Sequence, residues 1–176
     1  MTRKYHSPKE YQDAAKSLET PASELAFLAR SEYNFVRLAV ALNPNVTAEI
    51  LSSLVPINLE HWNEQDIARA LTQNSKTLPE TLNLLAEKLI PVLNNGRDND
   101  LGLEAGIYLC NNPSTPFETI ENIMASDKVA TLFRRKVASK SLRQDVLELL
   151  LTDRSEAVRK RAANSLEFLL QSDPFN

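Results

Sequence analysis

The spacing of apolar residues repeats five times along this chain. Counted from Thr20, Val46, Thr77, Thr115 and Ser141, the residues five, eight and nine places later are apolar in every case. These three places lie on one face of an α-helix, so each unit is predicted to open with a helix that buries this face. Self-similarity with a period of roughly 20 to 50 residues indicates a repeat architecture. The fifteen positions are Leu25, Leu51, Leu82, Ile120 and Val146 at the fifth place, Leu28, Leu54, Leu85, Ile123 and Leu149 at the eighth, and Ala29, Val55, Ala86, Met124 and Leu150 at the ninth.

Polar residues before these faces predict where the helices begin. Thr77 is followed three residues later by Glu80, and Thr115 by Glu118. In such a capping box the hydroxyl accepts a hydrogen bond from the third helical amide, while the carboxylate reaches back to the cap amide. We therefore expect these hydroxyls to act as helix caps. The same spacing recurs at residues 7–10 and 141–144.

A second, shorter helix is predicted in each unit, and it ends at an asparagine in the first three units. Apolar or small residues occur seven and three places before Asn43, Asn74 and Asn112. Asn43 and Asn112 precede proline, which disfavours helical backbone at the residue before it. Small residues within these helices, such as Ala39 and Ala70, would let neighbouring helices approach closely. The fourth and fifth units keep the pattern at residues 133–138 and 158–163.

The segment Val36-Arg-Leu-Ala-Val-Ala-Leu-Asn-Pro-Asn-Val-Thr-Ala-Glu-Ile-Leu resembles the leucine-rich repeat variant, a helical relative of HEAT repeats. The resemblance covers about residues 20–165 and is strongest in the first unit. It implies an all-α fold, a right-handed superhelical solenoid of about five helical-hairpin repeats, with no enzymatic activity. Some relatives bind an iron-sulfur cluster through an N-terminal cysteine cluster. This chain has Cys110 alone, so we expect no cofactor and a buried, apolar role for that residue.

We expect one α-solenoid domain over residues 1–176. Its predicted parts are an N-terminal capping helix within 1–19, repeats at 20–45, 46–76, 77–114, 115–140 and 141–170, and a tail at 171–176.

Charge is distributed unevenly along the chain, although the net charge is only −3. Residues 44–127 carry four basic and twelve acidic side chains, a net charge of −8, whereas residues 128–161 carry ten basic and four acidic ones, a net charge of +6. The mildly acidic total argues against a dedicated nucleic-acid binder. No apolar run reaches the roughly 18 to 20 residues of a membrane helix. No signal peptide is visible, so a cytoplasmic location is expected and no membrane association.

The basic residues of the fourth and fifth units fall into matching columns. Superimposing the apolar residues of the two units aligns Arg134 with Arg159, and Arg37 belongs to the same column. Stacked helices lie about 10 Å apart, so six cations are predicted to form one patch that could bind an anionic partner. The alternative is a solvated face on which the cations pair with nearby acids. The six are Arg134, Arg135, Lys136, Arg159, Lys160 and Arg161, and Lys140, Arg143 and Arg154 could widen the patch.

Two insertions interrupt the repeat. The first contains Trp62, which is either an exposed anchor for a partner or packed over the seam between units. His61 lies between Glu60 and Glu64, residue types that occur in metal and acid-base sites, but the pattern is weak. The second insertion, residues 94–100, has the composition of a calcium loop without the spacing of an EF-hand, and favours a polar surface loop.

The sequence favours a non-enzymatic scaffold that binds another macromolecule, and a protein partner is the leading expectation. No nucleophile motif or phosphate-binding glycine loop is present. The alternative is a nucleic-acid-binding or DNA-repair protein that resembles the alkylpurine DNA glycosylases built on HEAT-like repeats. A third possibility is self-assembly through exposed terminal units, which leaves the oligomeric state open.

Overall fold

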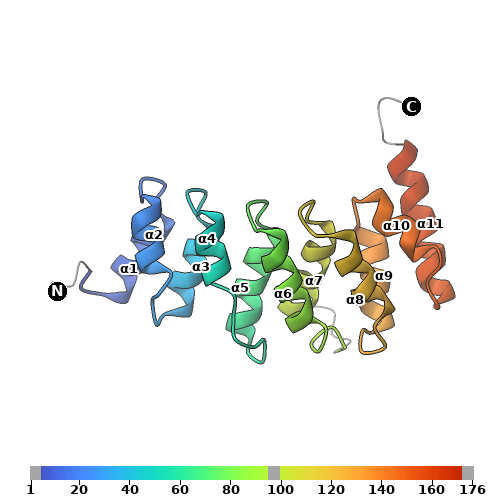
Figure 1. Cartoon of the computed structure of the whole chain (residues 1–176), viewed down its shortest axis with the longest axis horizontal. Helices are drawn as coiled ribbons and strands as arrows, with labels where there is room; N and C mark the ends of the chain where they lie inside the picture. The colour runs from blue at the N-terminus through green and yellow to red at the C-terminus, as the bar shows by residue number, and fades with distance from the viewer. Residues whose placement is uncertain (1–4, 95–99, 172–176) are drawn as a thin grey trace.

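A computed structural model describes residues 5–94 and 100–171 of the chain, and these residues form an all-α fold (Figure 1). Eleven helices and no strands occur in the described part. The helices are α1 (Pro8–Lys16), α2 (Ala22–Leu28), α3 (Asn34–Leu42), α4 (Ala48–Ser53), α5 (Trp62–Gln73), α6 (Pro79–Leu89), α7 (Leu101–Asn111), α8 (Phe117–Ala125), α9 (Thr131–Lys140), α10 (Gln144–Leu150) and α11 (Glu156–Gln171).

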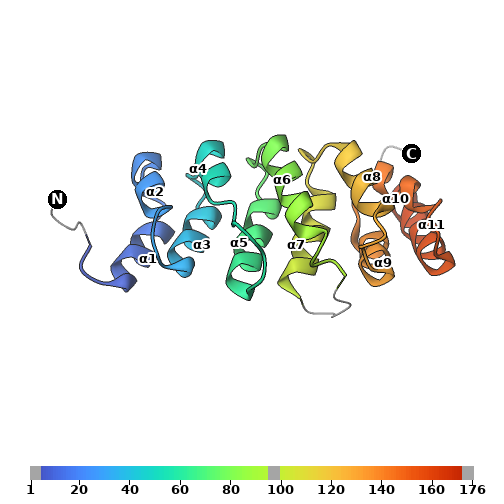
Figure 2. The same cartoon turned by 60° about the horizontal axis from the view of Figure 1, so that its bottom comes forward.

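The helices form two layers in an elongated array, with α1 and α11 at its opposite ends (Figures 1 and 2). The odd-numbered helices make one layer, in which each helix packs against the next, from α1 through α11. The even-numbered helices make the other layer, with contacts between α6 and α8 and between α8 and α10. Consecutive helices also pack across the layers. This two-layer arrangement of packed helices is compatible with the predicted helical repeat.

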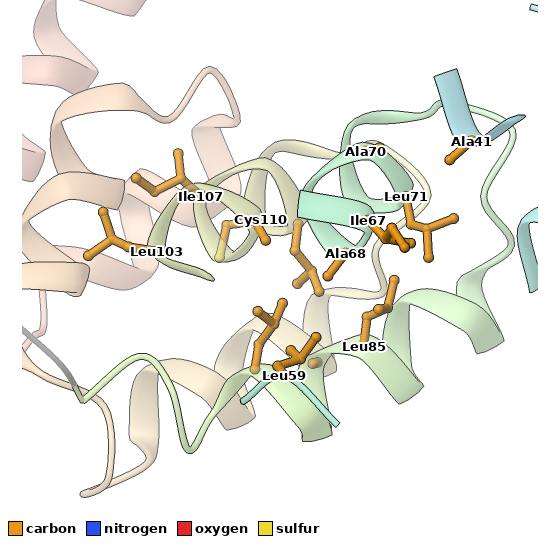
Figure 3. Packing of buried hydrophobic residues seen from close by; sticks show 14 of the residues in the cluster. Ala41, Leu59, Ile67, Ala68, Ala70, Leu71, Leu85, Leu103, Ile107 and Cys110 are labelled. Carbon is orange, nitrogen blue, oxygen red and sulfur yellow. The ribbon is translucent and has the colours of Figure 1, made fainter. Parts of the chain in front are cut away.

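The apolar face of each even-numbered helix is buried. Thirteen of the fifteen repeated positions are buried, and the other two, Val55 and Leu149, are partly buried against the same core. The predicted columns of the odd-numbered helices are also buried, including Val36, Ile67 and Leu109. One continuous hydrophobic core therefore runs between the layers, and Figure 3 shows the part formed by α5, α6 and α7.

Small residues allow the close packing of the odd-numbered layer. Ala39 and Ala70 are buried, as expected. At Gly106 of α7, a Cβ atom would lie 2.7 Å from Cε2 of Phe133 and 2.8 Å from Cδ2 of Leu93. Distances this short are overlaps rather than contacts. The absence of a side chain at this position therefore lets the ring of Phe133 pack directly against the backbone of α7.

The predicted helix caps are wrong at two of the repeated threonines. The hydroxyls of Thr77 and Thr115 donate to the carbonyl oxygens of Leu71 and Leu109, each at 2.7 Å, instead of accepting from the next helix. The N-cap residues of α6 and α8 are Leu78 and Pro116, and α10 likewise begins after Arg143. Each threonine hydroxyl thus supplies a hydrogen bond to a carbonyl group near the C-terminal end of the preceding helix.

The hydroxyl half of the N-terminal capping box is confirmed at α1, whereas the carboxylate of Glu10 binds the amide before the cap residue Ser7 rather than the cap amide. The amide of Glu10 donates to Oγ of Ser7 at 3.3 Å, and the carboxylate of Glu10 accepts from the amide of His6 at 3.0 Å. This helix ends at Lys16, and Leu18 beyond it is 70% exposed.

The asparagines that end the second helices tie adjoining units together. Nδ2 of Asn43 donates to the carbonyls of Ala15 at 2.8 Å and Ser17 at 2.9 Å. Nδ2 of Asn112 donates in the same way to Thr72 at 2.9 Å and Asn74 at 3.1 Å. Each recipient belongs to the preceding odd-numbered helix or its corner. We call this series the asparagine ladder, and it includes Asn74, which donates to Ala41.

Candidate functional site

Arg134 lies in the interior and is not part of a surface patch. The residue is 1% exposed, and its Nε donates to Oδ2 of Asp153 at 2.7 Å. Its Nη1 donates to the carbonyl oxygen of Val129 at 2.8 Å. The side chain of Asp153 is 4% exposed, so both charges are removed from water. The prediction of one six-residue surface patch is wrong at this residue, because its column points into the seam between units.

The other five cations of the predicted patch lie on α9 and α11, which are neighbours at the end of the odd-numbered layer (Figure 1). Arg135 and Arg161 are exposed, and no ion pair of either is found among the described residues. Lys160 is exposed and lies 2.6 Å from Glu156. Arg159 and Lys136 are partly buried. The cationic surface of α9 and α11 therefore rests mainly on Arg135 and Arg161.

Two of the residues that were expected to widen this surface, Arg143 and Arg154, form hydrogen bonds or ion pairs with other residues of the chain. Nη1 of Arg143 donates to the carbonyls of Asn112 at 3.1 Å and Thr115 at 3.0 Å. Its Nη2 lies 2.6 Å from Oδ2 of Asp145, and this hydrogen bond is the main cause of the lowered pKa of Asp145. Arg154 pairs with Asp127. The acids near the patch thus neutralise part of its charge, as the alternative interpretation expects.

Trp62 is the first residue of α5 and is 67% exposed. The alternative that it packs over the seam between units is wrong. The neighbouring His61 is also exposed, while Glu64 is partly buried. No group of three or more potential metal ligands occurs among the described residues. Residues 95–99 of the second insertion lie outside the described residues.

Cys110 is buried in α7, as expected. Burial raises the pKa of its thiol to about 12, so the thiol is protonated near neutral pH. A protonated, buried thiol is neither a nucleophile nor a metal ligand. Cys110 therefore acts as a packing residue.

A cavity that the sequence reasoning missed lies beside Arg37 of α3. It has a volume of about 410 Å³ and is bounded by residues of α3, the α4–α5 connection and α5. Nε of Arg37 and Oε2 of Glu64 are buried without a hydrogen-bond partner among the described residues. The arginine column was visible in the sequence, but the bend of the first insertion that closes this space was not. The lining residues are Ala29, Arg37, Ser53, Leu54, Val55, Pro56, Ile57, Asn58, His61, Glu64 and Ile67.

An aromatic cluster at the first units was also missed. The ring centroids of Tyr5 and Tyr11 are 4.9 Å apart, and Tyr33 stacks on Phe35 at 5.4 Å. The rings of Tyr5, Tyr11 and Tyr33, together with Phe27, border a hollow of about 590 Å³. No single helical period in the sequence places these aromatic residues on one face. They meet because of the way α1, α2 and α3 pack.

Comparison with known proteins does not place the chain in a family. No family model matches it, no curated protein is significantly similar, and no solved structure matches. Within the described part of the chain, every helix falls short of the length or apolar character that crossing a lipid bilayer requires.

Proposed function

We propose that this protein is a non-enzymatic helical-repeat scaffold that binds another protein along one face of its array. The arrangement we infer is a right-handed superhelical solenoid of five repeats, similar to the leucine-rich repeat variant and HEAT-like proteins. The two-layer array and the asparagine ladder support it. Helical solenoids present long surfaces whose outward residues are free to serve binding while the core columns hold the stack.

We infer that the binding face is the outward side of the odd-numbered helices, which includes α9 and α11. Neighbouring odd-numbered helices pack against one another from α1 to α11, so their outward side is one continuous surface.

The observation that carries the proposal is the exposed pair of cations on α9 and α11, Arg135 and Arg161. Both lie in the segment with a net charge of +6, at one end of a protein whose total charge is −3. Complementary charge accelerates encounter and selects partners. An acidic protein surface is the partner that this arrangement fits.

The test is a double charge reversal, Arg135→Glu with Arg161→Glu. The matched control is Lys9→Glu with Lys16→Glu, which makes the same charge change at exposed positions of α1 at the opposite end. Crosslinked partners are identified by mass spectrometry at about 0.1 M salt, where exposed charges still interact over about 10 Å. We expect the wild type and the α1 control to recover an acidic protein, and we expect the α9/α11 variant not to recover it.

Binding to fluorescein-labelled duplex DNA is measured in parallel. Affinity for DNA that falls steeply with salt, and that disappears in the α9/α11 variant, would replace the protein partner with a nucleic acid. Equal recovery of all partners by the three proteins would refute the role of this surface.

A further inference from the structure

Arg37 and Arg134 occupy the same place in two different units of the array. Each follows a buried apolar residue of its helix, Val36 in α3 and Phe133 in α9. The corner that ends the next even-numbered helix also matches. There, Asn58 Oδ1 accepts from the amide of Glu60 at 3.4 Å, and Asp153 Oδ1 accepts from the amide two residues later at 2.7 Å. Asn58 is therefore the counterpart of Asp153.

The two arginines have different partners because their corners differ by one functional group. At Arg134, the carboxylate of Asp153 takes both Nε at 2.7 Å and Nη2 at 3.5 Å. At Arg37, the counterpart Asn58 is a neutral amide, and Nη2 of the guanidinium donates to Oδ1 of Asn34. Nε of Arg37 has no partner among the described residues. One unit thus supplies an internal carboxylate and the other does not.

The space beside Arg37 is the cavity of about 410 Å³ described above. This volume lies in the range of small-molecule sites, roughly 300 to 1,000 Å³. Glu64 lines the same cavity, and its Oε2 is buried without a partner among the described residues. Leu54, Val55 and Ile67 give the cavity an apolar wall. A cation, an anion and an apolar wall therefore line one space.

We propose that this cavity binds a small zwitterion, an α-amino acid with an aliphatic side chain. Its carboxylate pairs with Arg37 as Asp153 pairs with Arg134. Its ammonium group donates to Glu64, and its side chain contacts the apolar wall. A ligand with both charges is required, because a simple anion would be repelled by Glu64 and a simple cation by Arg37. Burying a charged group without a partner is costly, so a ligand that satisfies both groups gains affinity from each. This site is independent of the proposed protein partner.

The chemistry is tested by isothermal titration calorimetry on the full chain with four probes. L-Leucine carries both charges, 4-methylpentanoate lacks the ammonium group, L-leucinamide lacks the carboxylate, and N-acetyl-L-leucine imitates the end of a peptide. We expect L-leucine to bind and the first two analogues to bind at least tenfold more weakly. Equal or tighter binding of N-acetyl-L-leucine would assign the site to a peptide terminus and overturn the amino-acid proposal. If L-leucine gives no binding heat at concentrations up to about 10 mM, its dissociation constant is too high for specific binding, and the amino-acid proposal is overturned as well.

The residues are tested with four variants whose folding is checked by circular dichroism. Arg37→Gln and Glu64→Gln should each weaken L-leucine binding at least tenfold, whereas the exposed control Lys128→Gln should leave it unchanged. Asn58→Asp restores an internal carboxylate at the place of Asp153. This variant should raise the melting temperature and weaken L-leucine binding at least tenfold, because the new carboxylate competes for Arg37. If Asn58→Asp or Arg37→Gln binds L-leucine with wild-type affinity, the assignment is refuted. If one of these variants fails to fold, the other still tests it.

Discussion

The ion pair between Arg134 and Asp153 allows a sharp test of how the C-terminal units are held together. The change is Asp153→Asn, which removes the negative charge and keeps a side-chain oxygen for the turn to the amide of Ser155. The second unit has an asparagine at the corresponding corner, Asn58, so the backbone geometry accepts this residue. The substitution therefore isolates the charge of Asp153 from its role in the turn.

The magnitude follows from burial. The side chains of Arg134 and Asp153 are 1% and 4% exposed, so water cannot replace the lost carboxylate. Removing one partner of a buried ion pair costs about 3 to 5 kcal/mol, because the other charge stays buried without compensation. Arg134 keeps its hydrogen bond to Val129, which places the expected loss near the lower limit, about 3 kcal/mol. The free energy of unfolding of a whole domain is only about 5 to 15 kcal/mol.

The assay is urea denaturation followed by far-ultraviolet circular dichroism. With a slope of about 2 kcal/mol per molar urea, the midpoint should fall by about 1.5 M. The matched control is Asp127→Asn, which breaks the exposed pair with Arg154 and should cost less than about 1 kcal/mol. If Asp153→Asn costs no more than this control, the pair does not hold the units together and the reasoning is refuted. The double variant Arg134→Met with Asp153→Leu should regain most of the lost stability, because it leaves no buried charge.

Four further outcomes are expected. Asn112→Ala removes two rungs of the asparagine ladder and should lower the free energy of unfolding by about 2 to 3 kcal/mol, whereas the exposed Asn122→Ala should change it little; equal thermal melts of the two variants would contradict this. Gly106→Ala should lower the free energy of unfolding by about 1 to 3 kcal/mol in spite of the helix propensity of alanine, because Phe133 is buried and cannot move away from the new Cβ. A higher melting temperature of this variant would show that Phe133 can move away. Cys110 should react with a thiol reagent at pH 8 only after denaturation, and rapid labelling of the native protein would contradict its burial. The pKa of this thiol is raised in the folded state, so its contribution to stability should be present below about pH 9 and should decrease as the pH rises toward 12. The decrease is measured by urea unfolding at several pH values, as the difference in unfolding free energy between the wild type and Cys110→Ala.

The sequence predicted the all-α fold and most of its core, because burial of an apolar face leaves a period that can be counted. Leu25 and Leu51 occupy equivalent places and are both fully buried. The sequence did not predict what the polar residues of the same repeat do. Thr77 was expected to accept a hydrogen bond from the next helix and instead donates to the previous one, and a hydroxyl can do either.

The candidate site was less predictable than the fold, because charged side chains obey no single period. Arg134 and Arg135 are adjacent in sequence, yet one is 1% exposed and the other is on the surface. The difference depends on whether a carboxylate from another unit reaches the arginine, and Asp153 does so from 19 residues away. The cavity at Arg37 likewise depends on the bend of residues 56–61. Such pairings become visible only when the units are stacked.

The asparagine ladder has a consequence for how the protein comes apart. Its rungs join residues 26 to 40 positions apart, so each reaches only the adjoining unit. Within the described residues, ties of this range do not join one end of the array to the other. Removing α1 and α2 should therefore leave the later units folded, and unfolding should proceed inward from an end, unit by unit. The length of the proposed binding face would then depend on how many units remain docked, and a partner that spans several units would also stabilise the array against fraying.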